Sequence, residues 1–385
     1  MASRPNNANS DPGKVLLAMS GGVDSSLAAA LLKERGYQVV GCFMRLGSDD
    51  SAESFEPCDD AEPSADARPR HQGCCSLNDA TDARAVAARL HIPFYVLNFK
   101  KDFGRIIDYF VSEYNAGRTP NPCVRCNDWL KFGKLADYAA SIEADWIATG
   151  HYARIARPDD DRGRPRLLRG RDPNKDQSYV LFGTPQSMLQ RMILPIGEYT
   201  KDQVRHMARE HGLLIHDKPD SQEICFVPDN NYGRLVAERS PDQVRPGKVL
   251  DVQGNVLGEH PGHQHFTIGQ RRGLNLAVGH PVYVIDKNPA TNTVTIGEAD
   301  RLLAAGLEAD QTNWHVDSPT GPMRCQVKIR SMSQPAPATV IVTGDSTLRV
   351  EFDEPMSAVS PGQAVVCYAG DELIGGGWIT RALRD

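Results

Sequence analysis

The sequence contains no apolar run that approaches the ~20 residues a helix needs to cross a bilayer, which argues against a membrane-spanning protein. Residues 1–13 have no apolar core of the kind a signal peptide carries, and we expect them to form a disordered leader. An excess of positive charge is also missing, since the net charge is -6. This argues against a strongly cationic nucleic-acid binder, although local basic patches still act over about 10 Å.

An even, regularly spaced set of cysteines is missing as well. The nine cysteines form an odd count with uneven spacing, and without an export signal this predicts a reducing, cytoplasmic compartment. Apolar runs hold Cys42, Cys325 and Cys367, which we expect to be core residues. Loop-like positions hold Cys123, Cys126, Cys225 and the adjacent pair Cys74 and Cys75. The stretch "TPNPCVRCN" places two of these thiols after two prolines, which leaves zinc, a disulfide, an iron–sulfur cluster and sulfur chemistry open.

Strand-like and helix-like runs alternate over the first part of the chain. The predicted strands are "KVLLAM", "YQVVGCFMRL", "PFYVLNF" and "DWIATGHYARI", and the last predicted helix, "TKDQVRHMAREHG", has a Thr200/Gln203 capping box and Gly212 as its stop. This alternation predicts a parallel sheet with ligands at the carboxyl ends of its strands. Residues 47–75 are acidic and rich in Ser, Pro and Asp, so we expect a surface insertion.

From about Gly247 the pattern changes to short β-like runs separated by Gly, Pro, Asn and Asp, which predicts a small barrel or sandwich. We therefore predict an α/β fold in three parts. These are a parallel-sheet domain over residues 14–222, a small central domain over 223–297 and a C-terminal β-barrel over 298–385.

The stretch "AMSGGVDSS" lies where the first strand meets the first helix. Gly21 and Gly22 can adopt positive φ and expose backbone N–H groups, and the helix dipole adds positive potential. The loop lacks the GK[ST] of a Walker A motif and the spacing of a dinucleotide loop. It resembles the loop of the PP-loop (adenine nucleotide alpha hydrolase-like) ATP pyrophosphatases. The resemblance implies ATP contacts from Ala18, Met19, Ser20, Gly21, Gly22, Val23, Asp24, Ser25, Met44 and Gly150. Asp24 would help to hold Mg²⁺, cap the helix, or do both.

Further motifs narrow the resemblance. With "SGGVDSS", the stretches "TPNPCVRCN", "ATGHYAR", "KDQSYVL", "DSQEICFVPD" and "GQRRGL" resemble, in order, the bacterial tRNA-specific 2-thiouridylase family from Lys14 to the C-terminus. The family adenylates O2 of the wobble uridine of tRNA with ATP and then replaces it with sulfur. The resemblance implies that Cys225 carries a persulfide, that Cys126 is the nucleophile, and that a persulfide-donating sulfur carrier protein is a partner.

The chemistry suits these residues. Adenylation turns a poor leaving group into AMP, and a thiolate-type sulfur is reactive at neutral pH. Cys126 could attack the persulfide and release sulfide, leaving a Cys126–Cys225 disulfide, or the persulfide could attack C2 and Cys126 resolve the adduct. Pro120 and Pro122 predict a stiff loop holding Cys126 just before a helix whose N-terminus lowers the thiol pKa.

Position 123 departs from one common form of the family, which carries Asp there. The resemblance implies that Asn121, Pro122 and Cys123 line the target base. The three thiols Cys123, Cys126 and Cys225 could instead hold an iron–sulfur cluster with one open site. A closed zinc site would need two further ligands besides a C-x-x-C pair.

The same resemblance implies contacts to tRNA. They come from His151, Lys175, Asp176, Gln177, Arg271, Arg272, Arg330, Ser331 and Gln363. The basic stretch before Lys175 could otherwise be a solvated loop, and the run "RCQVKIRSM" an ordinary barrel strand with solvated charges. Two other functions stay open. One is a PP-loop ligase that activates a carboxylate, and the other is an RNA-binding module with a vestigial nucleotide site.

Overall fold

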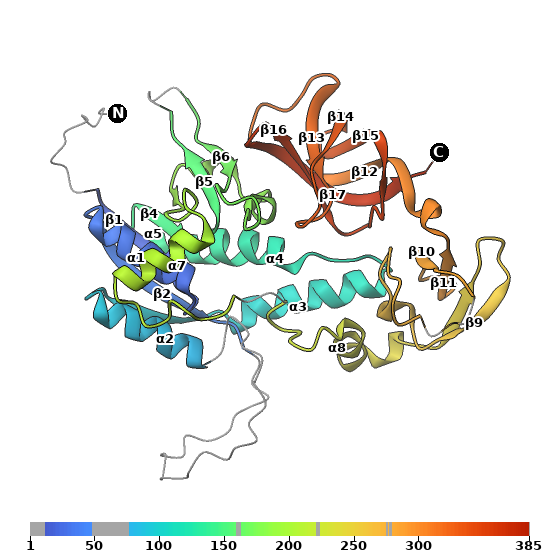
Figure 1. The fold of residues 1–385 in the computed structure, drawn as a ribbon, viewed down its shortest axis with the longest axis horizontal. Coiled ribbons are helices and arrows are strands. Elements are labelled where there is room, and N and C mark those ends of the chain that lie inside the picture. The colour runs from blue at the N-terminus through green and yellow to red at the C-terminus, as the bar shows by residue number, and fades with distance from the viewer. Residues whose placement is uncertain are drawn as a thin grey trace, which may run out of the picture.

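The computed structural model describes residues 12–47, 77–158, 163–220, 224–274, 276 and 279–384. Nearly all of the predicted leader and of the predicted insertion, with Cys58, Cys74 and Cys75, lies outside these residues. Figure 1 shows a sheet domain at one end, the long helix α3 leading from it, and a β-barrel above that helix.

The first domain is built on a five-stranded parallel sheet, as predicted. Its strands are β1 (Lys14–Ala18), β2 (Gln38–Arg45), β3 (Phe94–Asn98), β4 (Trp146–Thr149) and β7 (Met192–Ile193), in the order β3-β2-β1-β4-β7. Helix α1 (Val23–Glu34) connects β1 to β2, α2 (Leu77–Arg89) lies between β2 and β3, and α3 (Lys100–Asn115) begins the connection from β3 to β4. The strand order reverses between β1 and β4, and such a reversal is where open α/β sheets bind ligands.

The sheet is covered on both faces, which explains why its strands are nearly continuous apolar runs. Val15 and Leu17 of β1 face one hydrophobic cluster with Leu27 of α1, whereas Leu16 and Cys42 face another with residues of the helical segment after Thr119. Cys42 is fully buried, as expected, and burial raises its thiol pKa to about 12. This cysteine is therefore a packing residue.

The segment that carries the paired cysteines is helical from its second proline onward. It consists of α4 (Pro122–Arg125), a π-helical stretch η1 (Cys126–Lys134) and α5 (Leu135–Ser141). The prediction of a stiff loop with a helix starting after Cys126 was wrong. Pro122 occupies a first-turn position, where its missing N–H costs nothing, so it starts the helix instead of delaying it.

Several elements connect the sheet to the rest of the molecule. They are β5 (Ala153–Ala156), β6 (Arg166–Arg169), the 3₁₀ turn η2 (Ser178–Leu181), α6 (Gln186–Leu189), α7 (Lys201–Glu210) and α8 (Tyr232–Arg239). The Thr200/Gln203 capping box of α7 is confirmed. Helix α8 was not predicted. It has only eight residues, and its Val236 is buried in the same hydrophobic cluster as residues of α3, so tertiary packing supports it.

The central domain contains a four-stranded sheet in the order β10-β11-β8-β9. Its strands are β8 (Gly247–Leu250), β9 (Val256–His260), β10 (Tyr283–Asn288) and β11 (Thr293–Gly297). Three short 3₁₀ turns, η3 (Pro241–Gln243), η4 (His263–His265) and η5 (Ala299–Leu302), flank them. The predicted domain divisions at 222/223 and 297/298 stay predictions.

A closed barrel completes the chain, as predicted. Its strands are β12 (Leu303–Trp314), β13 (Met323–Lys328), β14 (Ala336–Gly344), β15 (Thr347–Ser357), β16 (Ala364–Ala369) and β17 (Glu372–Leu383), and the β12–β17 pairing closes the ring. Residue pair Glu372 and Leu168 links β17 to β6, so the β5–β6 hairpin extends the barrel sheet. Among the described residues, no helix has both the length and the apolar character to cross a membrane.

Candidate active site

The glycine turn after β1 leads directly into α1. Gly21 has φ +75, and a Cβ there would overlap the carbonyl of Asp79, so only glycine fits. Gly22 is the N-cap with φ -92, which corrects the expectation of positive φ at both glycines, and no side chain caps the helix. The Ser20 N–H donates to Ser25 Oγ at 3.1 Å. The turn therefore forms a site where an anion can bind, at a helix N-terminus flanked by hydroxyl groups.

The sheet brings Met44 and Gly150 to the same edge as this turn. Ala18 lies in register with Cys42 and Thr149, so the residues that follow on β2 and β4 border the turn. A Cβ on Gly150 would lie 2.6 Å from the Ser25 nitrogen, which is too close for a side chain. Glycine is therefore required at this position because the chain after β4 packs directly against the start of α1. Contact of either residue with adenine stays a prediction.

Asp24, in the first turn of α1, is held by a tyrosine and a buried lysine. The Tyr152 hydroxyl donates to Asp24 Oδ1 at 2.7 Å, and Lys201 Nζ lies 2.8 and 3.0 Å from the two carboxylate oxygens. Burial, followed by the charge of Asp24, raises the pKa of Tyr152, which keeps that hydroxyl a donor. A cation already neutralises Asp24, so a bound metal ion would compete with Lys201 for its oxygens.

The same lysine reaches Asp220. Lys201 Nζ lies 2.7 Å from Asp220 Oδ1, while Lys175 donates to Oδ2 at 2.7 Å and Arg205 lies 3.1 Å from Oδ1. Burial opposes ionisation of Asp220, but hydrogen bonds from Lys175 and Lys201 prevail and lower its pKa. Lys175, a predicted tRNA contact, is thus part of an ion network beside the glycine turn.

The two predicted catalytic cysteines pack against one hydrophobic cluster. Cys126 and Cys225 are both half-buried, and both contact the cluster formed by α3, Leu130 and Val227, which Met44 also joins. No disulfide joins them in this structure, whereas Cys123 is exposed. The two cysteines, which are 99 positions apart in the sequence, therefore pack against the same cluster, and Met44, the predicted adenine contact on β2, packs against it too.

The barrel supports the backbone in front of these cysteines. Gln363 Nε2 donates to the carbonyls of Thr119 and Pro120 at 3.1 and 3.2 Å, and the Thr119 N–H donates to Pro361 at 2.8 Å. A Cβ on Gly362 would lie 2.9 Å from the Thr119 carbonyl. Gln363, a predicted tRNA contact, is here a brace for the "TPNPC" backbone.

Arg125, directly before Cys126, sits in an aromatic box that sequence reasoning missed. Its guanidinium carbon lies 3.9 Å from the ring centre of Trp378, 5.2 Å from that of Tyr109 and 5.3 Å from that of Trp129. Such cation–π contacts fix the first helical turn against the barrel. No local sequence signal announces the box, because Trp378 comes from the last strand.

His151 follows Gly150 and is buried. Its Nδ1 lies 2.7 Å from Thr149 Oγ1, and its Nε2 lies 3.4 Å from Lys131 Nζ. Burial, then the charge of Lys131, lowers its pKa well below the usual value. The neutral ring therefore accepts from Lys131 at Nε2 and donates to Thr149 at Nδ1. Lys131, which no motif predicted, thereby joins the cysteine helix to the sheet edge.

Some of the other predicted tRNA contacts form hydrogen bonds within the protein, and the rest are exposed or half-buried. Asp176 Oδ1 accepts from the backbone N–H of Gly170 at 3.1 Å, and Gln177 Oε1 accepts from that of Tyr152 at 2.9 Å. Arg330 donates to the carbonyls of Ile268 and Ala358 and to Ser360 Oγ. Exposed or half-buried side chains remain at Arg271, Arg272 and Ser331.

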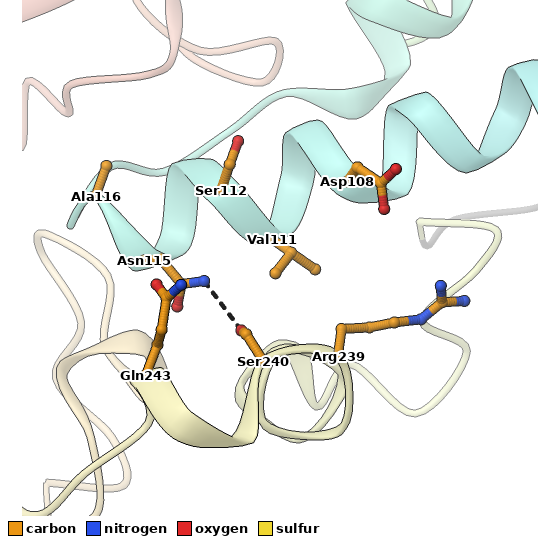
Figure 2. Close-up of a pocket in the computed structure, with 8 residues that line it drawn as sticks. All are labelled: Asp108, Val111, Ser112, Asn115, Ala116, Arg239, Ser240 and Gln243. Carbon is orange, nitrogen blue, oxygen red and sulfur yellow. Dashed lines mark hydrogen bonds between the residues drawn. The ribbon is translucent and has the colours of Figure 1, made fainter.

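A groove of about 580 Å³ lies away from these residues, between α3 and α8. Figure 2 shows its lining, with the Asn115 amide donating to Ser240 Oγ at 3.0 Å across the helices. None of the predicted site residues is among its eight lining residues. The groove marks the contact between the sheet domain and the segment leading to the central domain.

The thiols give no support for a resident cluster. Within the described ranges, no group of three or more His, Cys, Asp or Glu side chains could hold a metal ion. Cys123 is exposed whereas Cys126 and Cys225 are half-buried, so the three thiols do not share one environment. A magnesium ion that bridges phosphates needs only one or two carboxylates, and Asp24 fits that requirement.

Asp128, two residues after Cys126, is a buried carboxyl group whose ionisation lowers the stability of the fold, and this effect can be tested. Its Oδ1 is buried without a hydrogen-bond partner among the described residues, and burial raises its pKa to about 7, an effect that Arg125 partly offsets. The folded state therefore holds this proton more tightly than the unfolded chain does. The stability contributed by Asp128 is present at acidic pH and is lost as pH rises through about 7.

The Asp128→Asn variant is therefore expected to be more stable than wild type at pH 8, by about 1 to 4 kcal/mol, and to lose that advantage near pH 4. Urea unfolding at both pH values measures the difference. Asp217→Asn, on an exposed carboxylate, serves as the control and should show no such pH dependence. An equal effect of Asp128→Asn at both pH values would contradict the assignment.

A parallel sheet whose first strand turns through glycines into an uncapped helix defines a PP-loop-type nucleotide-binding protein. Residues 13–229 match the family model described as the tRNA methyl transferase HUP domain, 235–298 that of the PRC-barrel domain, and 304–379 that of the aminomethyltransferase beta-barrel domain. The tRNA-specific 2-thiouridylase MnmA of Carboxydothermus hydrogenoformans is 50% identical over 96% of this chain and 98% of its own. That of Symbiobacterium thermophilum is 47% identical over 96% and 93%. The chain belongs to the tRNA-specific 2-thiouridylase family, as its motifs predicted.

Two solved structures show a weaker similarity. A 4-thiouridine synthetase–RNA complex with bound ATP is 16% identical, covers 60% of this chain and 51% of its own, and has a TM-score of 0.33. An NMN synthetase from Francisella tularensis is 16% identical over 60% of this chain and 77% of its own, with a TM-score of 0.31. Likenesses at this level do not bear on the substrate.

Proposed function

We propose that this protein uses ATP to convert the wobble uridine of tRNA to 2-thiouridine. The observation that carries the proposal is that Cys126 and Cys225 pack against the same hydrophobic cluster, which Met44 of β2 also joins. Relatives that are about half identical over nearly the whole chain are named for this reaction. A carboxylate-activating ligase would have no use for this pair of thiols.

Adenylation would take place at the glycine turn. Uridine O2 attacks the α-phosphorus of ATP, the bond to pyrophosphate breaks, and the base becomes an O-adenylate. The N-terminus of α1 and Ser25 would hold the phosphates, and Asp24 would hold a magnesium ion, which neutralises phosphate charge when bound. Releasing Asp24 from Lys201 is part of that binding, since both cations need the same oxygens.

Sulfur transfer would follow at the cysteines. In one route, the terminal sulfur of a Cys225 persulfide bonds to C2 and AMP leaves. The Cys126 thiolate then attacks the Cys225 sulfur, frees the thiouridine and forms a Cys126–Cys225 disulfide. In the other, Cys126 attacks the persulfide first and the released hydrosulfide displaces AMP. Both routes end in the same disulfide, which a dithiol must reduce before the next turnover.

The remaining parts of the chain would engage tRNA and a sulfur donor. Arg271 and Arg272 are exposed and suited to phosphate contacts. Arg330 and Gln363 would set the position of the barrel loops against the catalytic segment as well as border the tRNA. Because nothing in the chain predicts the release of sulfur from free cysteine, we propose that a persulfide-carrying protein loads Cys225. A cytoplasmic location suits all of these partners.

The direct test is thiolation of unmodified tRNA by purified protein with ATP, magnesium, a persulfide donor and a dithiol. Retardation of the product tRNA in a mercury-containing gel reports 2-thiouridine, and AMP should appear in equal amount. Methyl transfer to tRNA, which the description of the matching family model names, is the alternative to measure in parallel, with S-adenosylmethionine supplied as the methyl donor. Methylation without thiolation would overturn the proposal.

A further inference from the structure

One segment ties the glycine turn to the approach to Cys225. We call residues 213–220, which follow α7 and lead toward Cys225, the return segment. Lys201, Arg205 and Arg209 are spaced by four, so they lie along one face of α7. Arg205 donates to the His216 carbonyl at 2.8 Å, and Arg209 lies 3.4 Å from Asp217. The return segment therefore runs back along the helix, held by its basic face.

Its last residue is the most firmly held. The carboxylate oxygens of Asp220 lie 2.7 Å from Nζ of both Lys201 and Lys175, and 3.1 Å from the Arg205 guanidinium. These side chains are only partly exposed, at 10% for Lys201 and 21% for Asp220, so solvent screens their attraction less than at the surface. By contrast, the Arg209–Asp217 pair is 62% and 76% exposed.

The return segment also contacts the glycine turn directly. Lys218 Nζ donates to the Gly21 carbonyl at 3.0 Å and to Asp79 Oδ1 at 2.7 Å, and it pairs with Asp82. Together with the Asp24–Lys201–Asp220 bridge, this gives the segment two connections to the phosphate-binding turn. The sequence then reaches Cys225 five residues after Asp220.

The bridge through Lys201 responds to what binds at Asp24. One ammonium is shared between two carboxylates, 2.8 Å from Asp24 and 2.7 Å from Asp220. If Asp24 held a nucleotide-bound divalent cation, that charge would repel the ammonium and compete for the same oxygens, and Lys201 would shift its interaction toward Asp220. Asp220, which comes five residues before Cys225 in the sequence, would then be held more tightly.

We propose that Lys201 and Asp220 are positioning residues that couple occupancy of the glycine turn to the exposure of the Cys225 thiol. Nucleotide binding would restrain the persulfide-bearing segment until the base is ready to be attacked. The inference deepens the proposed function and rests on it for the role of Cys225. The contacts that carry it stand on their own.

The experiment compares alkylation of Cys225 by iodoacetamide in the full chain with and without a non-hydrolysable ATP analogue and magnesium. Peptide mass spectrometry gives the rate at Cys225, with the exposed Cys123 as an internal reference. In wild type, saturating nucleotide should slow alkylation of Cys225 by about fivefold. The Asp220→Asn and Lys201→Met variants should lose this slowing. The matched variant Arg209→Gln changes a residue of the same helix that pairs with Asp217 of the return segment, and it should keep the slowing.

Nucleotide affinity is measured for each variant so that all are compared at saturation, and thermal unfolding confirms that each is folded. If Lys201→Met does not fold, Asp220→Asn carries the test. If nucleotide slows alkylation of Cys225 in Asp220→Asn as much as in wild type, the nucleotide shields Cys225 directly, and the coupling is overturned. The coupling is also overturned if nucleotide leaves the alkylation rate of the wild-type protein unchanged. If nucleotide slows alkylation of Cys225 in wild type but not in the two variants, the coupling is supported, even if the protein does not thiolate tRNA. A failure to thiolate tRNA would overturn only the proposed function.

Discussion

The Cys225→Ser and Cys126→Ser variants are each expected to lose 2-thiouridine formation completely while still releasing pyrophosphate from ATP with unmodified tRNA. A serine hydroxyl cannot carry a persulfide, and it cannot attack one at neutral pH because it is not ionised. Both side chains are only half-buried against the same cluster, so an isosteric oxygen should leave the fold and tRNA affinity nearly intact. A mercury gel and a filter-binding titration measure the two quantities.

Two further cysteines supply the controls. Cys325→Ser, on strand β13 of the barrel, should keep wild-type thiolation. Cys123→Ser separates the thiol routes from a cluster: because Cys123 is exposed and takes no part in either persulfide route, thiolation should persist. Loss of thiolation in Cys123→Ser, together with iron and acid-labile sulfide in anaerobically purified wild type, would favour an iron–sulfur mechanism. Normal thiolation in Cys126→Ser or Cys225→Ser would reject the assigned role.

The second large effect is expected from Asp24→Asn. The amide keeps the shape and can still accept from Tyr152, but it removes the charge that would bind a metal ion beside the phosphates. Pyrophosphate release should fall by about a hundredfold, with both cysteines unchanged. Single-turnover measurement of pyrophosphate with saturating tRNA reports this step alone.

Asp145→Asn is the matched control for that variant. Asp145 accepts from the Lys14 backbone N–H at 3.0 Å, at the amino ends of β1 and β4 and thus at the sheet edge opposite the glycine turn. It should leave pyrophosphate release unchanged, apart from a small loss of stability. Undiminished pyrophosphate release in Asp24→Asn would refute a catalytic role for this carboxylate.

Local features were predictable because their causes are local. The parallel sheet follows from the alternation of apolar runs and helices, and the α7 capping box from the three-residue spacing of Thr200 and Gln203. The helical start at Pro122 was mistaken because proline both breaks helices and begins them, and only the surrounding packing decides between the two. The glycine turn was recognisable, yet the different φ of Gly22 was not.

Long-range pairings could not be predicted from motifs. The Lys201 bridge between Asp24 and Asp220 joins three segments far apart in sequence, and no periodicity announces it. The same holds for Arg125 and Trp378, or for Gln363 and the "TPNPC" backbone. A resemblance can name residues such as Lys175 and Gln363, but it does not say that they also hold the protein's own parts together.

The brace from Gln363 and Pro361 to the backbone at Thr119 has a consequence for biosynthesis. The ribosome finishes the nucleotide-binding half long before it makes the strand that presses Trp378 against Arg125. A nascent chain can therefore pack its cysteine helix against the sheet early, but the contacts from the barrel to Thr119 and Arg125 form only after the last strand has been made. The final adjustment of the backbone in front of Cys126 is thus a late event in the synthesis of the chain.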